Sequence, residues 1–246
     1  RIHFEVHGEG VPLFLFFPIL ASSADVFGEP GAQALRGYLD RLTDRYRVLL
    51  VDYPSVGKSD TIPPRDFTVD RVCVDLLAVA DAAGFDRFAL WGYSWGAAAS
   101  LLLAGRTDRL TALVMGGWPP LDAPYDAVLR GARMQLDDPP ASARVILRSP
   151  AQYAQWVAFY ESNAGFRERD LLVRLACPRM VCFGSRGNSD VGGIPLPLAD
   201  TVRGRRGELE ALGWHVAEIP DRDFAVVFDP EALVPVVRSF LDTVTA

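Results

Sequence analysis

Apolar and polar positions follow two rhythms along this chain, one typical of strands and the other typical of helices. Short apolar runs predict strands over residues 2–6, 12–17, 47–52, 88–91, 110–115, 179–183 and 214–219. Between them, apolar residues at three- and four-residue spacing predict helices over residues 32–45, 70–83, 97–104, 202–212 and 231–244. Repeated strand–helix units indicate a mostly parallel, doubly wound sheet with helices on both faces. The first two strands, which a short glycine turn separates, are expected to form an antiparallel hairpin.

The alternation of predicted strands and helices is interrupted over residues 118–176, a segment much longer than one crossover helix needs. The segment is rich in proline and aromatic residues, and Tyr153, Trp156 and Tyr160 lie at helical spacing. An insert at the carboxyl edge of a parallel sheet covers the place where ligands bind. We therefore expect a core of residues 1–117 and 177–246 with residues 118–176 as a helical cap. Its aromatic residues are expected to line a pocket, the alternative being that they only pack inside the cap.

Composition narrows the classes of function. The 246 residues carry a net charge of −6, which does not indicate a basic surface for binding nucleic acid or an anionic membrane. The longest apolar run is too short to span a bilayer. The three cysteines form no C-x-x-C pair and indicate neither a disulfide framework nor a zinc site. We expect a cytoplasmic protein with a small-molecule partner and without metal or cofactor, and a homodimer is left open.

The pentapeptide Gly92-Tyr93-Ser94-Trp95-Gly96 lies between a predicted strand and a predicted buried helix. A serine at the centre of so tight a turn takes a strained backbone conformation, and its hydroxyl stands clear of the sheet. Glycines two residues before and after leave room for the neighbouring strand and helix. The pattern alone has low specificity, but this context favours a nucleophile elbow over an ordinary glycine-rich turn.

The order and spacing of these features resemble the α/β-hydrolase fold over essentially the whole chain. Besides the elbow, the segment from Asp52 to Asp60 is similar to the family's D-x-P-G-x-G-x-S turn, and the segment from Ile219 to Leu241 matches its final loop and helix. The resemblance implies that Ser94 is the nucleophile, with a histidine base, an orienting acid and backbone donors for an oxyanion.

The resemblance also implies two oxyanion donors. One is the backbone N–H of Trp95, the residue after the nucleophile. The other usually follows a His-Gly pair after the first core strand, where this chain has Phe17-Pro18. Proline has no N–H, so the second donor is expected to be that of Ile19.

By the same resemblance, the chain lacks the base. Phe224 occupies the position of the family's histidine, and a phenyl ring neither takes nor gives a proton. The three histidines are His3 and His7 on the first predicted hairpin and His215 at the start of the last predicted strand. None of these positions is within reach of Ser94 in this fold.

The acid is missing as well. The family places it three residues after the glycine that corresponds to Gly184, and Gly187 stands there. Asp190 is the first carboxylate in that loop and is interpreted as a solvated residue, the alternative being a catalytic acid. Asp223, beside Phe224, is a poor base at neutral pH because an ordinary aspartate has a pKa near 4.

Removing the histidine of a serine triad costs on the order of 10⁶ in turnover. We therefore expect an α/β-hydrolase-fold enzyme that no longer runs triad hydrolysis. Its reaction is expected to be an elimination, cyclisation or isomerisation of a small carbonyl-bearing or polycyclic compound in an apolar capped pocket. The expected substrate-binding residues are Tyr93, Trp118, Tyr153, Trp156 and Phe224.

Three alternatives remain open at this point. The first is a serine esterase or lactonase with an unusual base, which is Asp190 or Asp223 with a raised pKa, or water. The second is a ligand-binding protein without catalysis. The third is an ordinary triad enzyme in which Phe224 is an engineered replacement of histidine.

Overall fold

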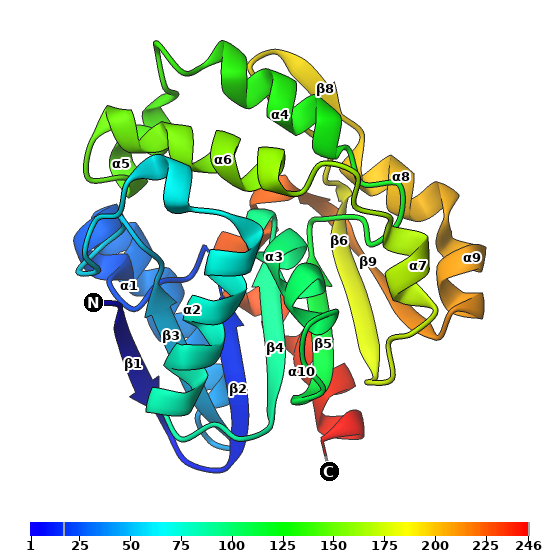
Figure 1. Ribbon diagram of the computed structural model, residues 1–246. Coiled ribbons are helices and arrows are strands. Elements are labelled where there is room, and N and C mark those ends of the chain that lie inside the picture. Colours follow the sequence, from blue (N-terminus) through cyan, green and yellow to red (C-terminus); the bar gives the residue numbers. More distant parts are fainter. Residues whose placement is uncertain (17, 246) are drawn as a thin grey trace.

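A seven-stranded sheet in the order β1-β3-β2-β4-β5-β6-β9 forms the centre of the molecule (Figure 1). The computed structural model describes residues 1–16 and 18–245. The strands of this sheet are β1 (His3–His7), β2 (Val11–Phe16), β3 (Tyr46–Asp52), β4 (Phe88–Tyr93), β5 (Leu110–Gly116), β6 (Arg179–Arg186) and β9 (Trp214–Asp223). All neighbouring pairs are parallel except β1 and β3. The α/β-hydrolase fold predicted from the sequence thus has the expected mostly parallel sheet.

The predicted hairpin between the first two strands is wrong. β1 pairs antiparallel with β3, which lies between β1 and β2, and β2 runs parallel to both β3 and β4. The difference has a physical reason. From Leu13 to Phe16 every residue of β2 is buried, which suits the centre of a sheet, whereas every residue of β1 is half-buried, which suits an edge.

Helices cover both faces of the sheet (Figure 1). They are α1 (Ser23–Leu42), α2 (Val69–Ala82), α3 (Trp95–Ala104), α4 (Tyr125–Met134), α5 (Ala141–Ile146), α6 (Ala154–Ser162), α7 (Glu168–Leu172), α8 (Leu198–Gly204), α9 (Arg206–Ala211) and α10 (Pro230–Val244), with 3-10 turns η1 (Pro64–Asp66), η2 (Pro150–Tyr153) and η3 (Phe224–Phe228). The helix expected from residue 32 begins at Ser23 and is interrupted at Gly28, where φ is 65° and ψ is −151°. The single helix expected over residues 202–212 is divided between α8 and α9.

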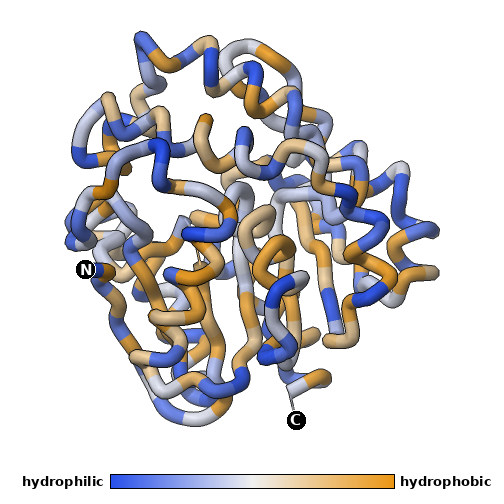
Figure 2. Tube along the Cα trace, viewed as in Figure 1, coloured by the Kyte–Doolittle hydropathy of each residue, from blue (hydrophilic) through white to orange (hydrophobic). Residues whose placement is uncertain are grey.

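Two hydrophobic cores lie on opposite faces of the sheet. α1 and α10 pack on one face, and α2 and α3 pack on the other. Successive residues of β4 alternate between the cores, with Phe88 and Leu90 facing α2 and α3 while Ala89 and Trp91 face α1 and α10. Figure 2 shows the strands as largely hydrophobic and the outer turns of the helices as largely hydrophilic. Among the described residues, no helix has both the length and the apolar character required to cross a bilayer.

The carboxyl ends of the strands are covered by elements from two parts of the sequence. α4, α5 and α6 lie above this edge (Figure 1). A small hairpin of β7 (Ser189–Val191) and β8 (Ile194–Leu196) packs against α4. At their contact, a Cβ on Gly131 would lie 2.5 Å from the carbonyl oxygen of Val191. The division of the chain into a core and a cap at residues 117 and 177 remains a prediction.

The turn after β3 is held by a buried carboxylate. Asp52 is fully buried and accepts hydrogen bonds from the backbone N–H of Ser22 at 2.9 Å, the hydroxyl of Ser22 at 2.5 Å and the N–H of Lys58 at 3.0 Å. These bonds join the turn to the start of α1. The aspartate of the family-like turn therefore has a structural task here.

Candidate active site

Ser94 lies at the sharp turn between β4 and α3. Its φ of 55° and ψ of −127° are strained for a residue with a side chain. The close approach of the helix requires glycine nearby, because a Cβ on Gly92 would lie 2.3 Å from the carbonyl oxygen of Gly96. The N–H of Ser94 donates to the carbonyl oxygen of Gly116 at 2.8 Å, which joins the turn to β5. This is the geometry expected of a nucleophile elbow.

Ser94 is half-buried, and no hydrogen bond to its hydroxyl is found within residues 1–16 and 18–245. Trp95 is the first residue of α3, so its N–H belongs to the positive end of a helix dipole. Pro18 lines a cavity together with Ser94, and Ile19 behind it is buried. Phe17 lies outside the described residues. The assignment of Trp95 and Ile19 as oxyanion donors remains a prediction.

Phe224 lies at the cavity of Ser94. It begins η3 and lines a cavity together with Ser94. Its ring centroid is 5.6 Å from that of Tyr93, and its carbonyl oxygen accepts a hydrogen bond of 2.9 Å from the Tyr93 hydroxyl. Burial raises the pKa of Tyr93. Tyr93 therefore keeps its proton at neutral pH and acts as a donor rather than as a base.

All three histidines lie among the described residues and far from Ser94. His3 and His7 are on β1 and His215 is on β9, each three strand positions from β4 in the sheet order. At about 4.8 Å between neighbouring strands, this places them about 14 Å away across the sheet. The ring of His215 stacks on Phe240 of α10, with 5.9 Å between centroids. An imidazole base is therefore not available to Ser94 within this chain.

The two carboxylates considered as substitutes have different surroundings. Asp190 is exposed on β7 and lines a cavity that also includes Ser94 and Trp95. Asp223 is exposed at the end of β9, and its carboxylate accepts a hydrogen bond of 2.9 Å from the N–H of Ala225. Asp223 therefore caps η3, and Asp190 is the carboxylate that the structure brings to the cavity of Ser94.

The position of the family's acid lies in a tight turn. The N–H of Gly187 donates to the carbonyl oxygen of Gly184 at 2.8 Å. A Cβ on Gly187 would lie 2.8 Å from the same oxygen, which is closer than side-chain carbons approach backbone oxygens. A carboxylate at this position would therefore require the turn to open, so the loop itself differs from one that carries an acid.

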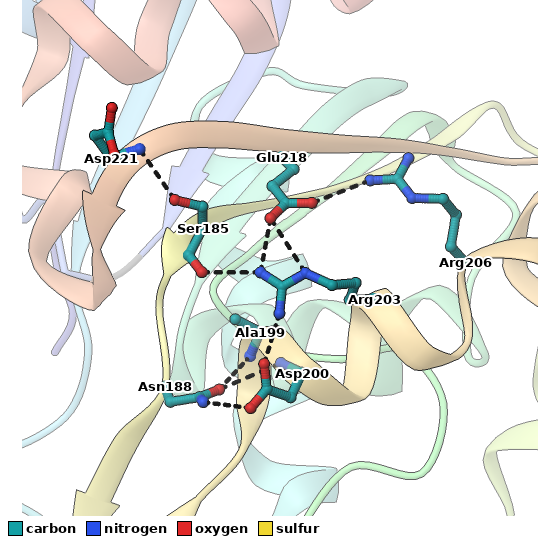
Figure 3. A network of polar contacts seen from close by, with 8 residues as sticks. All are labelled: Ser185, Asn188, Ala199, Asp200, Arg203, Arg206, Glu218 and Asp221. Atoms are coloured by element: carbon teal, nitrogen blue, oxygen red, sulfur yellow. Dashed lines mark hydrogen bonds and ion pairs between the residues drawn. The ribbon is translucent and has the colours of Figure 1, made fainter.

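A polar network holds this loop against α8 and β9 (Figure 3). The guanidinium of Arg203 donates to the carbonyl oxygen of Ser185 at 2.8 Å and to the carboxylate of Glu218 at 2.7 Å. The Ser185 hydroxyl accepts a hydrogen bond of 3.0 Å from the N–H of Asp221, and the side-chain oxygen of Asn188 accepts from two N–H groups at the start of α8. The loop is therefore fixed from several sides.

Two cavities meet at Ser94. One has a volume of about 480 Å³ and mostly apolar walls, including Pro18, Phe27, Tyr93, Val145, Phe224 and Phe228. The other has a volume of about 360 Å³ and several polar groups in its walls, including Gln135, Tyr153, Trp156, Tyr160 and Asp190. Ser142 and Ile146 of α5 line both. The site therefore has an apolar side and a polar side, with the serine between them.

The structure brings four of the five expected substrate-binding residues to these cavities: Tyr93, Tyr153, Trp156 and Phe224. Trp118 is not among the residues that line them. It follows Gly117, whose φ of 59° turns the chain at the end of β5, and it is buried with its ring centroid 5.5 Å from that of Tyr125.

Sequence reasoning missed several wall residues. Gln135 accepts a hydrogen bond of 2.8 Å from the Tyr153 hydroxyl, and no motif marks it. Phe27 and Phe228 line the cavity but lie far apart in the sequence. Only Gly28, the glycine at which α1 is interrupted, marks this part of the wall in the sequence. Among the described residues, no cluster of three or more potential metal ligands is present.

Comparisons with known proteins agree with this geometry. A family model described as "alpha/beta hydrolase fold" matches residues 12–164. The putative carbamate hydrolase RutD of Caulobacter segnis is 34% identical over 123 residues, which cover 48% of this chain and 43% of that protein. Haloalkane dehalogenase 2 of Mycobacterium tuberculosis is 29% identical over 124 residues, which cover 48% of this chain and 40% of that protein. The chain spans less than half the length of each of these relatives.

Solved structures give the same picture over the whole chain. A thermophilic esterase from Thermogutta terrifontis has a TM-score of 0.70 at 22% identity, covering 100% of this chain and 94% of that one. The N-acyl homoserine lactonase AidH, in its complex with N-butanoyl homoserine, has a TM-score of 0.66 at 18% identity, covering 98% of this chain and 93% of that one. At these identities the likeness shows the fold alone.

Proposed function

The chain belongs to the α/β-hydrolase fold family, and from this we propose that it is a small-molecule enzyme whose reaction at Ser94 does not use a catalytic triad. The relatives found above carry the names of hydrolytic enzymes, which supports an enzymatic role in general. The observation that carries the finer proposal is Phe224. Phe224 lines the cavity of Ser94, and the resemblance to the family assigns it the position of the histidine that triad hydrolysis needs.

The proposed substrate is a small carbonyl-bearing or polycyclic compound that undergoes elimination, cyclisation or isomerisation. Negative charge that develops on a carbonyl oxygen beside Ser94 is stabilised by the amino end of α3, where the N–H of Trp95 lies. The apolar walls contact the substrate, displace water from its surface and hold it in a reactive conformation. Neither effect requires an acyl-enzyme.

A second candidate is a serine esterase or lactonase in which Asp190 serves as the base. One observation favours it, because Asp190 lines the same cavity as Ser94 and Trp95. Its exposure weakens the case, since a solvated carboxylate has little capacity to take a proton from a serine hydroxyl.

A fluorophosphonate probe separates the two candidates. The purified protein is incubated with an alkyl fluorophosphonate, and modification of Ser94 is followed by mass spectrometry beside Ser94→Ala and Asp190→Asn controls. The proposal expects no prompt labelling, and it expects p-nitrophenyl acetate to be hydrolysed at the same rate by the parent and by Ser94→Ala. Prompt labelling that Asp190→Asn abolishes would establish the second candidate instead.

A further inference from the structure

A groove on the outer side of α1 shares walls with the cavity at Ser94. It has a volume of about 660 Å³ and lies between α1 and the start of α10. Phe27 and Phe228 line both the groove and the apolar cavity at Ser94. Their rings meet edge to face, with 6.1 Å between centroids. Phe27 and Phe228 therefore form a wall that the two spaces share.

The break in α1 sets the position of this pair. At Gly28 the backbone leaves the helical conformation, so the first turn with Phe27 is set off from the rest of α1. Beyond the break, the groove runs past the small residues Gly31, Ala34 and Gly37. Gln33 lies along this stretch, and the far end of the groove is polar, with an ion pair of 3.0 Å between Arg41 and Glu231.

Two large apolar side chains at this place are exposed. Phe228 is 47% exposed and Val145 of α5 is 55% exposed, and both line the apolar cavity of Ser94. Apolar surface left in water is unfavourable by about 25 cal/mol per Å². Exposed apolar groups at the edge of a cavity are typical of a surface that a ligand covers.

We propose that the groove between α1 and α10 continues the substrate site and binds the distal part of a long apolar chain whose carbonyl end lies at Ser94. This inference rests on the proposed function. Beyond the break, from Gly31 to Arg41, the groove follows ten residues of α1, or about 15 Å at about 1.5 Å per residue. The ligand class is therefore a long-chain carbonyl compound, and the two phenyl rings, which are in contact, must move apart for its chain to pass. The polar end at Arg41 and Glu231 suits a hydroxyl or another polar terminus.

A chain-length series tests the proposal. Linear 2-alkanones of six to sixteen carbons are titrated while tryptophan fluorescence is followed, since Trp95 and Trp156 line the site of Ser94. In the parent, affinity is expected to rise by up to about fourfold for each buried methylene throughout the series. Gln33→Trp fills the groove, so its affinities are expected to match the parent for short ketones and to stop rising for long ones. Asp40→Trp, an exposed residue of α1 outside the groove, is the matched control and should follow the parent.

The outcomes distinguish a failure of the role proposed for the groove from a failure of the proposed function. Short ketones that bind, with a plateau at the same length in all three proteins, would overturn the role of the groove alone. Failure of even the six-carbon ketone to bind would overturn the proposed function and the groove together. Sedimentation velocity is run on the same proteins. An altered oligomeric state in Gln33→Trp with an unaltered chain-length profile would assign the groove to a second copy of the chain and overturn the proposal.

Discussion

Replacing Phe224 by histidine returns an imidazole to the site without returning the acid that would orient it. In a serine triad, loss of the histidine costs about 2 × 10⁶ in turnover, whereas loss of the acid alone costs about 3 × 10⁴. A histidine without its acid is therefore worth at most about 70-fold. We expect Phe224→His to raise ester hydrolysis by no more than this factor.

The structure gives the reason why no acid is present to help. A side chain on Gly187 would lie 2.8 Å from the carbonyl oxygen of Gly184, and the loop is fixed by Arg203. The carboxylate of Asp223 is already bonded to the N–H of Ala225. The introduced ring would therefore lack a partner that selects its tautomer and orientation.

The assay is hydrolysis of p-nitrophenyl butyrate by the parent, Phe224→His and Phe224→Leu, with Phe224→His/Ser94→Ala to show that any gain depends on the serine. The hydrogen bond from Tyr93 reaches the backbone of residue 224, so these variants leave it in place. A gain above about 10⁴ would refute the reasoning, because it requires a carboxylate that orients the new imidazole.

Three further predictions concern stability. Tyr93→Phe removes the hydrogen bond to the carbonyl oxygen of Phe224 and is expected to lower the free energy of unfolding in urea by about 1 kcal/mol or somewhat more; an unchanged value would mean that packing alone holds η3. Asp52→Asn turns a buried acceptor of three hydrogen bonds partly into a donor, so a loss of about 3 kcal/mol is expected in the same assay, and a loss below about 1 kcal/mol would contradict it. Burial raises the pKa of the Cys73 and Cys182 thiols to about 12, so the folded state keeps protons that the unfolded state releases. The free energy of unfolding should therefore fall between about pH 9 and pH 12, and less so in the double alanine variant; equal falls in both proteins would exclude the thiols as the cause.

Local patterns predicted most of the elements, because each strand and helix satisfies its own periodicity. They failed where pairing is non-local. β1 joins β3 rather than β2, and β9 continues past Ile219 to Asp223 because β6 provides a partner up to Arg186. Asp190, expected in a loop, lies in a hairpin whose turn is formed by Gly192 and Gly193.

The candidate site likewise has one part that local sequence predicts and another part that depends on contacts between distant segments. The turn at Ser94 is encoded within five residues, so the sequence predicted its geometry, and the position of Phe224 followed from the family's order of elements. The residues of the cavity walls could not be predicted from the sequence, because Phe27, Val145 and Phe228 come from three distant segments that meet only after folding. No period in the sequence relates them.

The contact of Gly131 with Val191 joins α4 and the β7–β8 hairpin into one rigid unit, although the two residues are sixty positions apart in the sequence. Replacing the insert after β5 by the corresponding insert of another family member would remove the surface of α4 against which the β7–β8 hairpin packs. Chimeras of this fold should therefore carry both segments together, and in natural lineages a change in the length of one should be accompanied by a change in the other.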